Sequence, residues 1–147
     1  MKFEPLSYYD DRGIRFEYPE DWEVDVTDDG PRTTVALQSP GGLAFAFVTV
    51  DDNAPAPSEM VDEALAALKD EYPTLEASPA LETIDGHPAV GHDVEFVSLD
   101  LPNSCLIRSF RTPRRTVFVL GQWSDLESDE GEEAFRAIRR SLEETDA

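Results

Sequence analysis

The chain contains 147 residues, of which 40% are hydrophobic and 10% aromatic, and its 32 acidic and 12 basic side chains give a formal net charge of -20. This length and composition predict one folded domain, and they exclude both two full-sized domains and a wholly disordered chain. So acidic a chain repels phosphate backbones, which excludes nucleic acid as an expected partner.

The first third of the chain alternates short β segments with turns rich in Gly, Pro and Asp. The expected strands cover residues 13–18, 22–27, 33–38 and 43–50. The last of these strands is apolar on both of its faces, so we expect it to be covered on both sides.

The rest of the chain places strands between two amphipathic segments. The first helix is predicted over 58–72, where Val61, Leu65 and Leu68 share one stripe, and the second over 128–144. The expected strands between them cover residues 81–84, 87–98, 104–111 and 116–123.

Two helices, one after the fourth strand and one at the end, cannot wind a parallel sheet. We therefore expect an α+β fold with an antiparallel β-sheet covered by helices on both faces. The prediction is a single domain over 1–147 with short flexible ends near 1–10 and 144–147. Large aromatic side chains beside turns and on apolar strands are expected to anchor its core. These structural core anchors are Trp22, Phe45, Phe47 and Trp123.

Three segments resemble the PsbP superfamily of antiparallel α/β/α sandwiches. They are residues 13–24 with the motif Tyr-Pro-Glu-Asp-Trp, the Asp-Gly-His-Pro-Ala hairpin at 85–89, and the closing segment 135–142. The resemblance implies a PsbP-like fold and a binding or scaffolding role without catalysis. It does not transfer a specific function, and no metal-binding or partner-binding residue of the family can be matched to a position here.

The basic residues of this acidic chain are almost all arginines. Only two of the 12 are lysines, Lys2 and Lys69. A carboxylate surplus with almost no lysine predicts adaptation to concentrated salt, where screening removes the self-repulsion of the surface. The alternative is an acidic protein from a genome that prefers arginine.

The sequence contains few features that indicate where in the cell the protein is located. A single cysteine, Cys105, excludes an intrachain disulfide, and no apolar stretch approaches the ~20 residues of a membrane span. We therefore expect a soluble, cytoplasmic protein without a signal peptide or lipid anchor in the given chain, although a leader removed earlier would leave no trace.

The candidates for chemistry are His87, His92 and Cys105. Strand parity places His92 on an apolar face and His87 after a turn, so both are expected to be structural. A hairpin centred on 101–102 would set Cys105 opposite Ser98 and ~20 Å from His92, whereas a catalytic dyad needs about 3 Å. The sequence therefore predicts no catalytic residue, no metal site and no cofactor.

One basic cluster contradicts the overall charge, because Arg108, Arg111, Arg114 and Arg115 fall around one predicted hairpin tip at the sheet edge. As a functional hypothesis, Arg111, Arg114 and Arg115 form a partner-binding patch for an acidic group. The alternative is internal neutralisation, with Arg108 facing Glu95 across the hairpin. Three arginines of the last predicted helix fit either scheme, namely Arg136, Arg139 and Arg140.

These observations favour a non-enzymatic protein-interaction, adaptor or chaperone-like module with an unidentified protein partner. The alternative is a small-molecule or lipid-binding module with an apolar cleft between helix and sheet, and an unrecognised hydrolase comes third. An exposed apolar patch would favour a protein partner, and an enclosed apolar pocket would favour a ligand. The sequence predicts neither the partner nor the oligomeric state.

Overall fold

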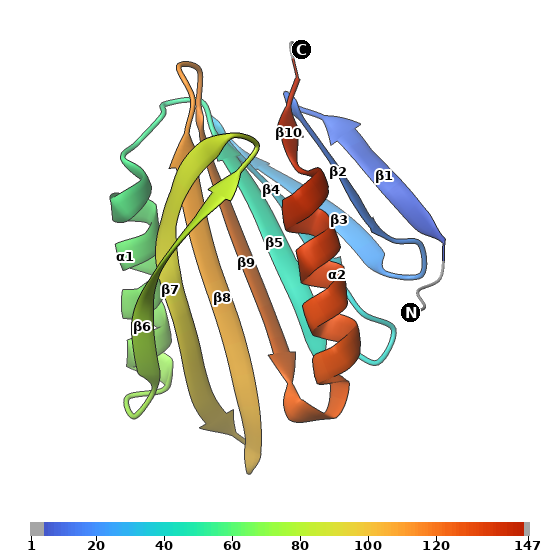
Figure 1. Cartoon of the computed structure of the whole chain (residues 1–147), viewed down its shortest axis with the longest axis vertical. Coiled ribbons are helices and arrows are strands. Elements are labelled where there is room, and N and C mark those ends of the chain that lie inside the picture. Colours follow the sequence, from blue (N-terminus) through green and yellow to red (C-terminus); the bar gives the residue numbers. More distant parts are fainter. Residues whose placement is uncertain (1–4, 146–147) are drawn as a thin grey trace.

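The computed structural model describes residues 5–145 (Figure 1). Its helices are α1 (Pro57–Glu71) and α2 (Ser128–Ser141), the latter preceded by the short 3-10 helix η1 (Asp125–Glu127). The strands are β1 (Leu6–Asp11), β2 (Ile14–Pro19), β3 (Glu23–Asp29), β4 (Arg32–Gln38), β5 (Ala44–Asp51), β6 (Glu76–Ile84), β7 (His87–Ser98), β8 (Leu101–Arg111), β9 (Thr116–Ser124) and β10 (Glu143–Glu144).

The strands form two antiparallel sheets. The larger has seven strands in the order β3-β4-β5-β9-β8-β7-β6, and the smaller has three in the order β1-β2-β10. This arrangement confirms the predicted antiparallel α+β class. The first strand expected between the two helices, 81–84, begins five residues earlier than predicted, at Glu76.

The two helices lie on opposite faces of the larger sheet. The helix α2 packs with β2 over β5 and β9, where its Phe135 and Ile138 join a buried cluster with Phe16. The helix α1 packs on β7, β8 and β9, and its Met60 and Val61 are buried there. Coverage by helices on both faces is therefore confirmed, with α1 placed toward the β6 side of the sheet.

Two glycines let α2 approach the sheet closely. A Cβ on Gly121 of β9 would lie 2.4 Å from the Phe135 ring, and one on Gly131 of α2 would lie 2.6 Å from Trp123 Cβ. Real Cβ atoms do not pack at such distances, so any larger residue at these positions would push the helix away from its core.

The chain ends differ from the expected flexible segments near 1–10 and 144–147. Residues 6–11 form β1, which pairs with β2 on one side, while Glu143 and Glu144 pair with β2 on the other. This order has a physical reason, because Ile14 and Phe16 of β2 are buried and the backbone of β2 needs hydrogen-bonding neighbours. Residues 1–4 and 146–147 lie outside the described part of the chain.

The β7–β8 hairpin turns at Leu99 and Asp100, whose φ angles are +53° and +65°, and not at the predicted 101–102. Positive φ at both central residues is typical of a two-residue type I′ hairpin turn. Cys105 consequently lies opposite Val94, four residues from its expected partner Ser98. A shift by an even number of residues keeps every side chain on its predicted face while changing its partner.

Candidate functional site

The proposed docking residue Arg115 belongs to the interior. Its guanidinium lies 2.7 Å from a Glu144 carboxylate oxygen, and its Nη1 donates a hydrogen bond to the Gly13 carbonyl at 3.3 Å. Only 9% of the side chain is exposed. Its prediction as a partner-binding residue is wrong, because the hairpin tip folds against β2 and β10 and Arg115 neutralises a carboxylate of its own chain.

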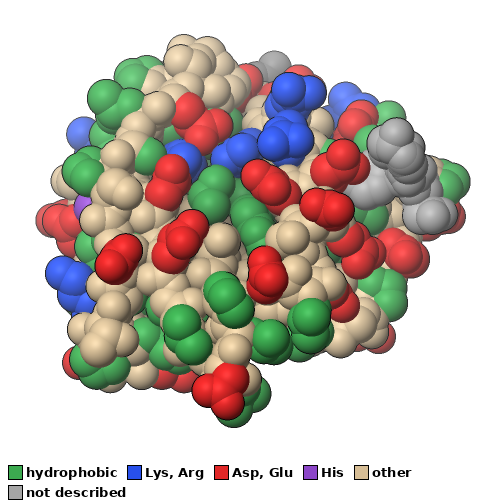
Figure 2. Space-filling model, turned by 60° about the horizontal axis from the view of Figure 1, so that its bottom comes forward, with side chains coloured by type: hydrophobic (Ala, Val, Ile, Leu, Met, Phe, Trp, Pro, Cys, Tyr) green, Lys and Arg blue, Asp and Glu red, His purple; other side chains and the backbone are tan. Residues whose placement is uncertain are grey.

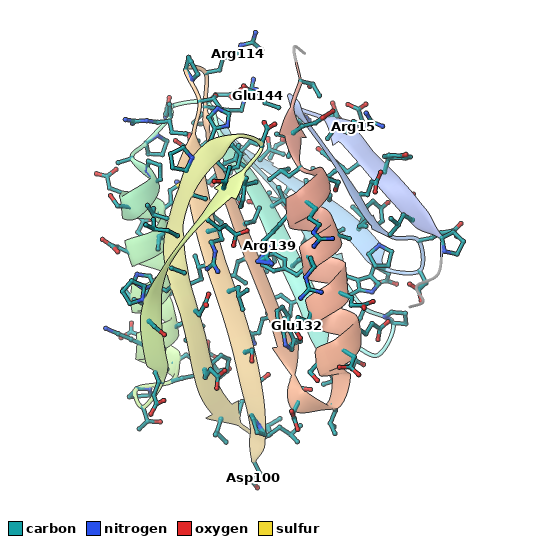
Figure 3. The ribbon with its side chains drawn as sticks, viewed as in Figure 1. Arg15, Asp100, Arg114, Glu132, Arg139 and Glu144 are labelled. Atoms are coloured by element: carbon teal, nitrogen blue, oxygen red, sulfur yellow. The ribbon has the colours of Figure 1, made fainter. Side chains whose placement is uncertain are left out.

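The other two candidates, Arg111 and Arg114, are exposed. Arg111 donates to the Ala54 carbonyl at 3.0 Å, and Arg114 donates to the Thr145 carbonyl at 3.3 Å. The hairpin that carries them joins the interior strands β8 and β9, so the tip lies at the end of these strands and not at the sheet edge (Figures 1 and 3). Their role in partner binding stays a prediction.

The arginine expected to face Glu95 has other partners. Arg108 Nε lies 2.6 Å from Glu82, and its Nη2 lies 2.8 Å from Asp93. The observed register sets Arg108 opposite Gly91, which has no side chain to block the guanidinium from reaching β6. Arg108 is thus neutralised by carboxylates of its own chain, as the alternative hypothesis expected, but its partners are Glu82 and Asp93 instead of Glu95.

The histidines and the cysteine do not converge. His92 lies on the α1 face, with Nε2 4.0 Å from Asp62, whereas His87 stacks on Phe110 of the α2 core with ring centroids 5.2 Å apart. Cys105 is fully buried in the α1 cluster, and this desolvation raises the pKa of its thiol to about 12. Within residues 5–145, no group of three or more His, Cys, Asp or Glu residues could hold a metal ion.

Two of the expected core anchors, Trp22 and Trp123, are buried, with 4% and 5% of their surface exposed. The other two, Phe45 and Phe47, are only half-buried on the face of β5 that carries α1. The expectation that 43–50 is covered on both sides is therefore wrong for this face. The reason is the position of α1, which packs over β7, β8 and β9 and leaves the aromatic face of β5 open.

Around these phenylalanines the sheet forms a hollow of about 750 Å³, called here the open trough. Two rows of paired residues cross it: Asp25, Ala36 and Phe47 form one, and Glu23, Gln38 and Phe45 form the other. The trough therefore has an aromatic floor on β5 and a carboxylate wall on β3. The residues of the open trough used below are Glu23, Asp25, Ala36, Gln38, Phe45 and Phe47.

The wall strand β3 is also an edge strand. All of its residues are exposed, and among the described residues it pairs only with β4. Arg12 of the β1–β2 turn pairs with Asp28 at 2.7 Å near one end of β3, which leaves residues 23–27 as the open edge. Sequence reasoning missed the trough because the apolar alternation of 43–50 shows two apolar faces without showing which one a helix covers.

A second group of exposed apolar side chains lies at the end of the molecule that holds the β7–β8 turn and η1. Leu99 and Leu126 are 93% and 68% exposed, and Val97 is 65% exposed. On the face seen in Figure 2, apolar side chains near this end alternate with carboxylates.

No protein-family model matches the chain, and no curated protein sequence matches it. Among solved structures, the cyanobacterial PsbP (CyanoP) of Synechocystis superposes with a TM-score of 0.69 over 97% of this chain and 94% of its own, at 12% sequence identity. The fold is PsbP-like. The resemblance expected from the sequence is thus confirmed at the level of the fold.

Two further structures share this PsbP-like fold. LpqN of Mycobacterium tuberculosis, described as involved in cell envelope biogenesis, has a TM-score of 0.56 and 15% identity, with coverage of 96% of this chain and 91% of its own. A Bacteroides thetaiotaomicron protein has a TM-score of 0.58 and 12% identity, with coverage of 89% of this chain and 44% of its own. At such identities the likeness shows the fold alone.

Within residues 5–145, no helix has both the length and the apolar character that crossing a bilayer requires.

Proposed function

We propose that this chain is a non-enzymatic binding module whose open trough holds an extended segment of a protein partner. The carrying observation is the pair Phe45 and Phe47, which lie half-buried on the trough floor with ring centroids 5.4 Å apart. Aromatic side chains left open to water on a sheet face are the type of surface that protein partners cover.

The form of the trough favours a protein segment over a small molecule. Small-molecule sites are concave and bury most of their ligand. Here the wall strand β3 is exposed along its whole length, so a ligand on the floor would stay open to solvent. The free edge of β3 lies two strands from the floor on β5, so a second part of the same extended segment can use its backbone donors and acceptors by strand addition.

The charge of the trough defines the chemistry of the segment. Glu23 and Asp25 are exposed on its wall, and neither is part of an ion pair within the described residues. An apolar side chain of the partner would lie on Phe45 and Phe47, and lysine or arginine side chains beside it would face the carboxylates. We therefore assign the trough to a segment that alternates apolar and basic residues.

Selection from a displayed library of random peptides tests this proposal without knowledge of the partner. Selected peptides should alternate apolar and basic residues, and their addition to labelled protein should shift the NMR amide signals of Ala36, Gln38 and Phe45. Phe47→Ser should weaken binding about tenfold or more, as loss of a central aromatic contact does. The matched control is Leu81→Ser, which removes an apolar side chain that is 78% exposed on β6.

Peptides that map to Leu99 and Leu126 instead would move the interaction surface to the other apolar group. A trough that takes up a fatty acid or detergent molecule but no peptide would favour the small-molecule and lipid alternative. Either outcome contradicts the proposal as stated.

A further inference from the structure

Three arginines of α2 share one side of the helix and line a hollow of about 180 Å³ with Glu82 and Thr83 of β6. They are Arg136, Arg139 and Arg140, spaced by three and four residues so that their side chains are neighbours. On the face that Figure 2 displays, several Lys and Arg side chains form a group in the upper centre, others lie apart at the edges, and the carboxylates are scattered. Figure 3 shows Arg139 beside α2, and this residue belongs to the last turn of the helix. This hollow is called here the arginine hollow.

The central arginine is held in place by its own chain. Arg139 Nη1 lies 3.4 Å from Glu82, and its guanidinium lies over the Phe135 ring at 5.0 Å. Only 15% of the side chain is exposed, and its Nε is buried without a hydrogen-bond partner among the described residues. Desolvation lowers the pKa of Arg139, although a guanidinium stays charged at physiological pH. The cation is therefore fixed and partly stripped of water.

The charge around the hollow is not balanced. Among the described residues, Glu82 is the only acidic one that lines it, and that carboxylate already pairs with Arg108 at 2.6 Å and with Arg139. Arg136 has one exposed pair, with Glu132 at 3.9 Å. Arg140 has no ion pair within residues 5–145. Like charges three and four residues apart on a helix repel one another, so a bound anion would relieve this repulsion.

We propose that the arginine hollow binds a phosphate group, either free or carried by a small molecule. Three guanidinium groups offer more donors than the two oxygens of one carboxylate can accept, whereas a phosphate has oxygens directed to several sides. Thr83 adds a hydroxyl at the rim. The hollow lies on the α2 face of the larger sheet, opposite the open trough, so this inference stands independently of the proposed function.

The test is a titration with inorganic phosphate at constant ionic strength, maintained with KCl, while NMR follows the arginine Nε–H signals. Saturable shifts at Arg136, Arg139 and Arg140 are expected. The double variant Arg136→Gln/Arg140→Gln should weaken binding about tenfold or more, because it removes two charge-assisted contacts. Both side chains are exposed, so the variant should keep its fold, which thermal melting checks.

The matched control is Arg111→Gln/Arg114→Gln, which removes the same charge at the β8–β9 tip and should leave phosphate binding unchanged. If the glutamine variant of the hollow does not fold, Arg136→Lys/Arg140→Lys keeps the charge, loses the forked donors and should still bind more weakly.

Tighter binding of glycerol phosphate than of inorganic phosphate would assign the site to a phosphorylated small molecule, and the reverse order would assign it to free phosphate. Shifts that do not saturate, shifts that are equal in the control and the hollow variant, or acetate binding as tight as that of phosphate would overturn the proposal.

Discussion

Arg108 of β8 reaches across β7 and places its Nε 2.6 Å from Glu82 of β6. The guanidinium also pairs with Asp93 of β7, so one buried cation joins three strands of the sheet. Only 6% of the Arg108 side chain is exposed. The contact is possible because the residue paired with Arg108 on the intervening strand is Gly91.

Replacement of this cation should destabilise the fold. In Arg108→Met, Glu82 and Asp93 lose their buried partner, and we expect the free energy of unfolding to fall by about 3 kcal/mol, as for other broken buried ion pairs whose partners keep some solvent contact. Urea denaturation measures this loss. Arg111→Met, at an exposed position, should change stability by less than ~0.5 kcal/mol. Equal stability of the two variants would contradict a structural role of Arg108.

The three hairpin arginines should separate into one structural and two surface residues. Arg115→Gln loses the contacts with Glu144 and the Gly13 carbonyl, so the free energy of unfolding should fall by about 2 kcal/mol. Arg111→Gln and Arg114→Gln should each stay within ~0.5 kcal/mol of the wild type. Thermal melting of the three single variants checks the order, and an unchanged melting temperature for Arg115→Gln would restore it as a surface residue.

Trp22 should be a major contributor to stability, since it is 4% exposed in the cluster between α2 and the sheet. Trp22→Ala is expected to cost about 3–5 kcal/mol, as large core truncations do. Chemical denaturation gives the value. Tyr8→Ala, at a ring that is 55% exposed, is the comparison and should cost far less.

The salt-adaptation hypothesis predicts that the melting temperature rises by many degrees between dilute buffer and molar KCl. The physical reason is screening of the net charge of -20, since the Debye length shrinks to ~3 Å at 1 M salt. Calorimetry across a KCl series measures the rise. A melting temperature that stays flat would instead support the alternative of an acidic protein from a genome that prefers arginine.

Cys105 should make stability fall at alkaline pH. Burial raises the pKa of its thiol from an ordinary value of 9.0 to about 12, so between these values the unfolded chain releases a proton that the folded chain retains. The free energy of unfolding therefore decreases as pH rises from 9 toward 12. Below pH 9 both the folded and the unfolded chain keep the thiol protonated, so the stability of the fold is not reduced by this group there. Cys105→Ala should show a shallower decline in urea denaturation over this range, and identical slopes would contradict the buried-thiol account.

Local sequence patterns determined most of the helices and strands of this protein. The alternation of side chains in 33–38 and 116–123, and the helical stripes of 58–72 and 128–144, predict elements that the structure contains, because each pattern lies within one segment. Strand alternation also predicts that His87 and His92, five residues apart on one strand, point to opposite faces. This prediction does not depend on the pairing of that strand with its neighbour, which differs from the expected register by an even number of residues. The net charge and the antiparallel α+β class follow from the sequence in the same direct way.

Only the tertiary structure decided which residues meet. The turn at Leu99 and Asp100, the burial of Arg115 and the reach of Arg108 to Glu82 depend on segments far apart in the chain, and no local pattern records them. The open trough exists because α1 covers β7 to β9 and leaves β5 open. The arginine hollow exists because Glu82 and Thr83 of β6 lie beside the arginines of α2. Side-chain periodicity fixes which face a residue occupies, whereas the packing of whole elements fixes what lies opposite that face.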